Sequence, residues 1–64
     1  MIELVNKLMQ LRESWTIQDF KDAYEDQWDK IPNSLEECRE KMEEFITLTY
    51  DESYIIECIE SEEV

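Results

Sequence analysis

The sequence predicts an α+β domain in which three helices are followed by a C-terminal β-hairpin. Two observations predict the helices: apolar residues recur every three or four positions up to residue 45, and two capping motifs mark helix starts. One observation predicts the hairpin. From residue 46 onward, β-branched and aromatic residues alternate with polar ones. A helical pattern also fits the last segment, so an all-α four-helix bundle remains the alternative.

The first helix is expected over residues 1–13. Leu4, Leu8 and Leu11 are spaced so that they share one helical face, which predicts the buried side. Arg12 follows Leu8 by four residues. We expect its apolar stem to lie along the edge of this face while its charged head stays in water.

The second helix is expected within residues 15–30. Thr16 is the predicted N-cap, and Asp19 places a negative charge in the first turn, where the helix dipole favours it. Trp15 and Phe20 occupy the two positions of a hydrophobic staple. These signals predict where the helix begins.

The third helix is expected to begin after Ser34. The run Ser34-Leu35-Glu36-Glu37 fits a capping box, in which side chains of the first turn accept backbone N–H groups. Its buried stripe is predicted to consist of Leu35, Cys38, Met42 and Phe45.

The hairpin is expected to join strands over residues 46–50 and 53–59. A three-residue loop would put the apolar residues on one face, in the pairs Tyr50–Tyr54, Leu48–Ile56 and Ile46–Cys58. In the alternative, a fourth helix begins at Asp51 and places Ile55 and Ile59 on one face. Residues 60–64 are expected to form a frayed acidic tail.

The composition limits the function. The 64 residues are enough for one domain, 1–64, with 18 acidic residues against 6 basic ones and a formal net charge of −12. Such a charge disfavours direct binding to nucleic acid or to an anionic membrane. Because neither a spanning segment nor a secretory signal is visible, we expect a cytoplasmic protein.

The residues that several kinds of catalytic and ligand-binding sites require are absent from this sequence. Glycine and histidine are absent, so phosphate-binding loops and histidine-based catalysis are not expected. Cys38 and Cys58 form no CxxC pair, and they are expected to be buried, reduced thiols. The sequence therefore predicts no enzyme activity, no cofactor and no metal site.

Acidic residues form a stripe on each of two predicted helices. The candidate partner-binding carboxylates are Asp22, Glu25, Asp26, Asp29, Glu36, Glu40, Glu43 and Glu44. These stripes can serve solubility alone, or they can bind a basic surface. Trp28 lies beside the first stripe and is the candidate aromatic anchor of an interface, although aromatic residues at helical spacing are commonly part of a core.

The order of three helices and a hairpin resembles a winged-helix domain. In that family the third helix enters the DNA major groove, but here residues 34–45 carry five glutamates, so that role is not expected to carry over. By size and charge the chain is similar to small acidic DNA-mimic inhibitors, which are often phage-encoded. This resemblance implies a protein-binding inhibitor that occupies a basic, nucleic-acid-binding site. The alternative is a structural or regulatory subunit, or a homodimer, whose acidity only confers solubility.

Overall fold

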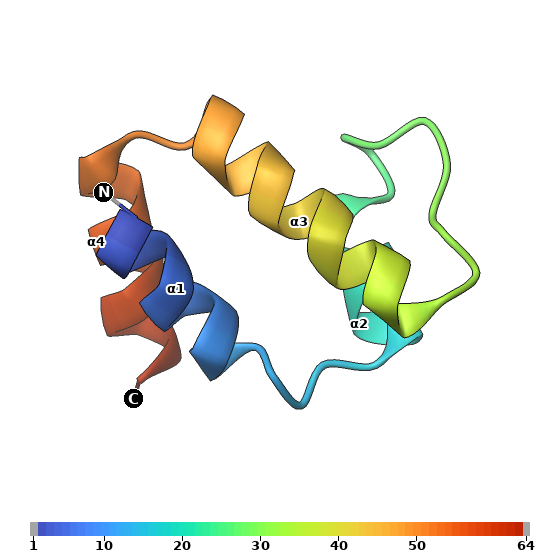
Figure 1. The fold of residues 1–64 in the computed structure, drawn as a ribbon, viewed down its shortest axis with the longest axis horizontal. Coiled ribbons are helices and arrows are strands. Elements are labelled where there is room, and N and C mark those ends of the chain that lie inside the picture. Colours follow the sequence, from blue (N-terminus) through green and yellow to red (C-terminus); the bar gives the residue numbers. More distant parts are fainter. Residues whose placement is uncertain (1, 64) are drawn as a thin grey trace.

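The computed structural model describes residues 2–63, and this part of the chain folds into four helices without a strand (Figure 1). The helices are α1 (Ile2–Leu11), α2 (Ile17–Tyr24), α3 (Leu35–Thr49) and α4 (Glu52–Glu62). Helix α1 packs on α4 and α3, and α2 packs on the other part of α3. Within residues 2–63, no helix has the length and apolar character that crossing a membrane requires.

The predicted start of the second helix is confirmed. The Thr16 side chain accepts the Asp19 N–H at 3.3 Å, and the Asp19 carboxylate accepts the Thr16 N–H at 2.8 Å. Trp15 and Phe20 pack edge to face with ring centroids 5.3 Å apart, as the staple predicts. Because two backbone N–H groups are satisfied at the helix start, the chain enters α2 in one defined direction.

Helix α2 ends earlier than the predicted range, at Tyr24, and residues 25–27 form a turn. The N–H of Trp28 nevertheless donates to the Tyr24 carbonyl at 2.9 Å, so the chain keeps a helical contact one turn further. This contact places the Trp28 ring on the Tyr24 ring, with centroids 4.5 Å apart.

The predicted start of the third helix is also confirmed, because the Ser34 hydroxyl accepts the Glu37 N–H at 3.4 Å. Its predicted stripe is only partly buried. Cys38 and Met42 are fully buried, whereas Leu35 is 39% exposed and Phe45 is half-buried. The inner face is instead extended by Ile46, which the prediction had assigned to a strand.

The predicted β-hairpin is wrong, because the segment forms the end of α3 and the whole of α4. Two observations explain why helix is preferred. Ile46 lies one turn after Met42 and continues its buried face, so the helix does not stop at residue 45. Asp51 then caps α4 by accepting the Tyr54 N–H at 2.8 Å. A helix cap needs no glycine, whereas a tight hairpin turn favours it.

The buried side of this segment is correspondingly reversed. Ile55 and Ile59 are buried, whereas Leu48 is 76% exposed and Ile56 is 40% exposed. The hairpin register required Leu48 and Ile56 to face the helices. With the hairpin the winged-helix resemblance is lost, and the all-α alternative describes the fold.

The C-terminal segment is ordered further than expected. Residues 60–62, which the sequence analysis expects to fray, form the last turn of α4. The Glu62 carboxylate accepts hydrogen bonds from the Arg12 guanidinium, which holds this turn against the end of α1. Val64 lies outside the described residues.

Candidate functional site: the acidic surface of α2 and α3

All eight carboxylates of the predicted stripes are on the surface. They are exposed side chains of α2, of the chain that follows it and of α3. Within residues 2–63, the ion pairs are Lys7–Glu63 and Arg12–Glu62, so no member of the stripes is neutralised by a salt bridge. Only Asp22 of the first stripe lies on α2 itself, because this helix ends at Tyr24, so the uncompensated negative surface spans α2, the chain that follows it and α3.

The carboxylates of α3 gather along shallow hollows. Glu36, Glu40 and Glu43 line a hollow of about 550 Å³ between α1 and α3, beside the side chains of Met9 and Arg39. A neighbouring hollow is lined by Glu40, Glu43, Glu44, Thr47 and Leu48. These hollows place four glutamates on one continuous side of α3.

The two stripes meet at one place. Asp29, from the chain after α2, and Glu44, from α3, line the same hollow of about 270 Å³, together with Trp28. Asp22, Glu25 and Asp26 line none of the hollows described above, and Asp22 accepts a hydrogen bond from Gln18 at 2.9 Å. The structure therefore brings Asp29 to the acidic side of α3 and leaves the rest of the first stripe outside these hollows.

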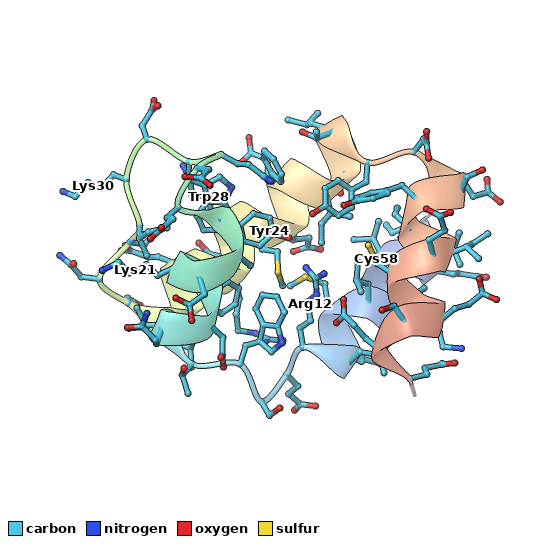
Figure 2. All side chains as sticks on the ribbon, turned by 180° about the vertical axis from the view of Figure 1, so that it is seen from behind. Arg12, Lys21, Tyr24, Trp28, Lys30 and Cys58 are labelled. Atoms are coloured by element: carbon cyan, nitrogen blue, oxygen red, sulfur yellow. The ribbon has the colours of Figure 1, made fainter. Side chains whose placement is uncertain are left out.

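The nearby cations do not neutralise this surface. The sequence places Lys21, Lys30 and Lys41 four residues from Glu25, Asp26 and Glu37, yet none of these pairs is an ion pair within residues 2–63. Lys21 and Lys30 point away from the body of the protein (Figure 2). The Lys41 ammonium lies over the Trp28 ring, 5.5 Å from its centroid.

Trp28 is a core residue and not an exposed anchor. Its side chain is 6% exposed, it stacks on Tyr24, and it meets Phe45 edge to face at 6.2 Å between centroids. Its indole Nε1–H is buried and has no acceptor among the described residues. A buried donor without an acceptor costs about 1–3 kcal/mol. Trp28 thus supports the hollow from below, at the point where the two stripes meet.

Sequence reasoning missed a second polar feature, the buried guanidinium of Arg12. The prediction that its head stays in water is wrong, because Arg12 is 6% exposed. Figure 2 shows the head directed into the protein interior. Its Nε and Nη2 donate to the Glu62 carboxylate, and its Nη1 donates to the Tyr24 hydroxyl at 2.7 Å.

The surroundings of Arg12 keep it charged. Burial alone lowers the pKa of this guanidinium, but the hydrogen bonds with Glu62 and Tyr24 and the negative charge of Glu62 outweigh it and leave the pKa above its ordinary value. The guanidinium also lies 4.4 Å from the centroid of the Trp15 ring. A cation without these partners would not be tolerated in a core of this size.

The network around Arg12 joins all four helices. The hydroxyls of Tyr24 and Tyr50 are 3.1 Å apart, and Arg39 of α3 donates to the Arg12 carbonyl at 3.2 Å. One sequence signal could have found the burial: Arg12 lies four residues after Leu8, in line with the buried face. Its partner Glu62 carries no such signal, because it is one of many glutamates. The network is a structural element, separate from the acidic surface.

Within residues 2–63, no group of three or more His, Cys, Asp or Glu side chains is placed to hold a metal ion. No protein family, no curated protein and no solved structure gives a significant match to this chain. The geometry and charge of the chain itself are therefore what bear on its function.

Proposed function

We propose that this protein is a non-enzymatic inhibitor that acts in the cytoplasm, or in the host cytoplasm if it is phage-encoded. Its acidic surface on α2 and α3 docks on a basic, nucleic-acid-binding site of a partner protein, in the manner of a DNA mimic. One observation carries the proposal: eight exposed carboxylates on α2, on the chain that follows it and on α3 have no salt-bridge partner within residues 2–63.

The charge arrangement supports this proposal over a small-molecule site. Neighbouring carboxylates three or four residues apart on a helix lie about 5–6 Å from each other, and each such pair costs a few tenths of a kcal/mol. A basic groove that binds a phosphate backbone offers cations in a comparable row, and pairing with them removes this repulsion. The hollows of α3 are shallow and open, so a protein surface fits them better than a substrate that must be shielded from water.

The proposal is tested with two charge-reversal variants and a matched control. One variant changes Asp22, Glu25 and Asp29 to Lys, and the other changes Glu36, Glu40 and Glu44 to Lys. The control changes three exposed carboxylates of α1 and α4, Glu3, Glu57 and Glu60, to Lys. All three variants alter the net charge equally, so a difference between them reports the position of the charge.

The measurement is the binding kinetics of a partner captured from native host extract at low salt and eluted with double-stranded DNA. We expect at least one stripe variant to lose binding, mainly through a slower on-rate, because steering depends on the summed field. The control variant should lose much less. Equal kinetics for all three variants, or binding that is insensitive to salt, would contradict the proposal.

A second candidate function is supported by exposed apolar side chains. Ile2 is 73% exposed and Leu48 is 76% exposed, so each offers apolar surface to a second chain. In this case the chain is a structural or regulatory subunit, or a homodimer, and the acidity only confers solubility. Sedimentation equilibrium separates the two candidates, because a dimer held by apolar contacts persists at high salt.

A further inference from the structure

Leu48 is the most exposed large apolar side chain among the described residues, and it lies between two hollows. It is 76% exposed near the C-terminal end of α3. It lines the hollow that contains Trp28 and Asp29, and it also lines the neighbouring hollow that contains Glu40 and Glu43. An aliphatic side chain in this position offers apolar surface to any group that enters either hollow.

The hollow that contains Trp28 and Asp29 is lined by two aromatic side chains, Trp28 and Phe45. Trp28 and Phe45 meet edge to face beneath Leu48, and the Trp28 side chain is 94% buried, since 6% is exposed. The indole Nε1–H has no acceptor within residues 2–63. Because this nitrogen is itself buried, it cannot donate to a partner that docks on the surface, and the hollow offers such a partner its aromatic and aliphatic side chains.

The charged side chains around Leu48 indicate that a group bound there carries positive charge. The two hollows that it lines contain four carboxylates and one ammonium group, from Asp29, Glu40, Glu43, Glu44 and Lys41. The surplus of three negative charges surrounds an apolar centre. A partner with one aliphatic side chain between basic residues matches this pattern, whereas an anionic or purely apolar partner does not.

We propose that Leu48 is the apolar anchor point of the acidic surface, and that it receives an aliphatic side chain from a basic segment of the partner protein. This inference rests on the proposed function and names the recognition element within it. The partner's aliphatic side chain packs on Leu48 and Phe45, and its flanking Lys and Arg residues pair with Asp29 and Glu44. Charge thus brings the partner to the surface, and Leu48 sets the register in which it docks.

The experiment uses two blocked peptides of seven residues as probes. Each has a Lys-Arg-Lys triplet on both sides of a central residue, which is leucine in one peptide and serine in the other. Both are titrated into ¹⁵N-labelled full-length protein at low salt while amide and indole signals are followed by NMR. We expect the leucine peptide to bind about tenfold more tightly than the serine peptide, the ratio expected for burying about half or more of a leucine side chain. We also expect it to move the Trp28 indole signal.

Two variants provide a matched comparison. Leu48→Ser removes the proposed anchor, and Ile2→Ser removes a side chain that is 73% exposed on α1, outside both hollows. Neither side chain is part of the core, so both variants should stay folded. We expect Leu48→Ser to abolish the preference for the leucine peptide and Ile2→Ser to retain it.

The outcomes separate this inference from the proposed function. If both peptides bind equally and move the Glu40 and Glu43 amides without moving the Trp28 indole, the anchor is overturned while the acidic docking surface stands. If Leu48→Ser keeps the full preference for leucine, the anchor is again overturned. If neither peptide perturbs α3, both proposals fail together.

Discussion

The guanidinium of Arg12 and the carboxylate of Glu62, 50 residues apart in the chain, form a hydrogen-bonded ion pair of 2.7 Å at the edge of the core. The pair joins the end of α1 to the last turn of α4. The Arg12 side chain is 7% exposed and that of Glu62 is 26% exposed, so the two charges are held in different degrees of contact with water. Because the two side chains differ in exposure, removing Arg12 and removing Glu62 should change the free energy of unfolding by different amounts.

Replacing Glu62 with Gln should destabilise the protein by about 2 kcal/mol. Breaking a buried pair leaves an uncompensated charge, which costs about 3–5 kcal/mol when both groups are fully buried, and the partial exposure of Glu62 reduces this figure. Urea unfolding at neutral pH measures the change. The control is Glu63→Gln, which removes the exposed pair with Lys7 and should cost less than about 1 kcal/mol. Equal losses for the two variants would contradict the buried role of Glu62.

The double variant Arg12→Leu with Glu62→Leu should recover most of the lost stability. It removes both charges together, and Tyr24 keeps a hydroxyl partner in Tyr50. The expected coupling energy in a double-mutant cycle is about 0.5–3 kcal/mol, which is the range for residues in direct contact. A coupling energy near zero would show that the pair contributes nothing beyond its separate members.

Two adjacent isoleucines test whether the C-terminal segment is a helix. Ile55 is fully buried and Ile56 is 40% exposed. Ile55→Ala should therefore cost about 2–5 kcal/mol through the cavity it leaves, and Ile56→Ala should cost less than about 1 kcal/mol. The predicted hairpin would reverse this order, because it turns Ile56 inward. Thermal unfolding followed by circular dichroism compares the two variants directly.

The helix starts were predictable because each depends on residues close in the chain. Thr16 with Asp19, and Ser34 with Glu37, are three residues apart, and both N-caps form, although of the capping box at Ser34 only the bond from the Glu37 N–H to the Ser34 hydroxyl is present among the described residues. The segment from residue 46 was not predictable in this way. Its alternation of β-branched and polar residues favours a strand locally, but Ile46 also continues the inner face of α3, and burial outweighs local preference.

The candidate site shows the same division between local and distant information. Helical spacing predicted that the carboxylates of α3 share one side, and the hollows along α3 contain all four of them. Asp29 lines a hollow together with Glu44 of α3, whereas Asp22 does not. This difference arises because α2 ends at Tyr24 and the chain that follows it carries Asp29 to α3. The pairing of Arg12 with Glu62 depends on the packing of α1 on α4, which no local pattern encodes.

The two thiols should differ in reactivity. Burial raises the pKa of both Cys38 and Cys58, so neither is readily deprotonated at neutral pH. Cys38 has no exposed surface and its sulfur lies 3.6 Å from the Pro32 carbonyl oxygen, whereas Cys58 is half-buried. Under native conditions iodoacetamide should modify Cys58 first, as read by mass spectrometry. Modification of Cys38 at the same rate as Cys58 would contradict the packing of α3.

Cys38→Ala provides a stability measurement at the same position. It should cost about 1 kcal/mol, because it removes one atom from a filled interior and leaves a small cavity. Cys58→Ala is the matched control, and it should cost less because that side chain is half-buried. Urea unfolding under reducing conditions compares the two variants. A larger loss for Cys58→Ala would show that the core is centred elsewhere.

Alkaline pH should destabilise the protein through Tyr50. Burial raises the pKa of this phenol above its ordinary value of 10.0, and the hydrogen bond with Tyr24 raises it further. The folded state therefore holds the proton more tightly than the unfolded state. This contribution is complete below pH 10.0, and it is lost as the pH rises from there toward the folded pKa.

Tyr50→Phe should reduce the dependence of stability on pH above this point. The phenylalanine ring keeps the aromatic packing on Phe45 and Tyr54, but it has no proton to lose. The slopes of unfolding free energy against pH should differ by as much as about 1.4 kcal/mol per pH unit, the value for one proton. Tyr54→Phe is the control: the pKa of Tyr54 is raised chiefly through Tyr50 and little by burial, and Tyr54 is 48% exposed, so the effect should be smaller. If Tyr50→Phe and wild type lose stability in parallel up to about pH 11.5, the Tyr50 hydroxyl is not held in the network that joins α2 to Arg12.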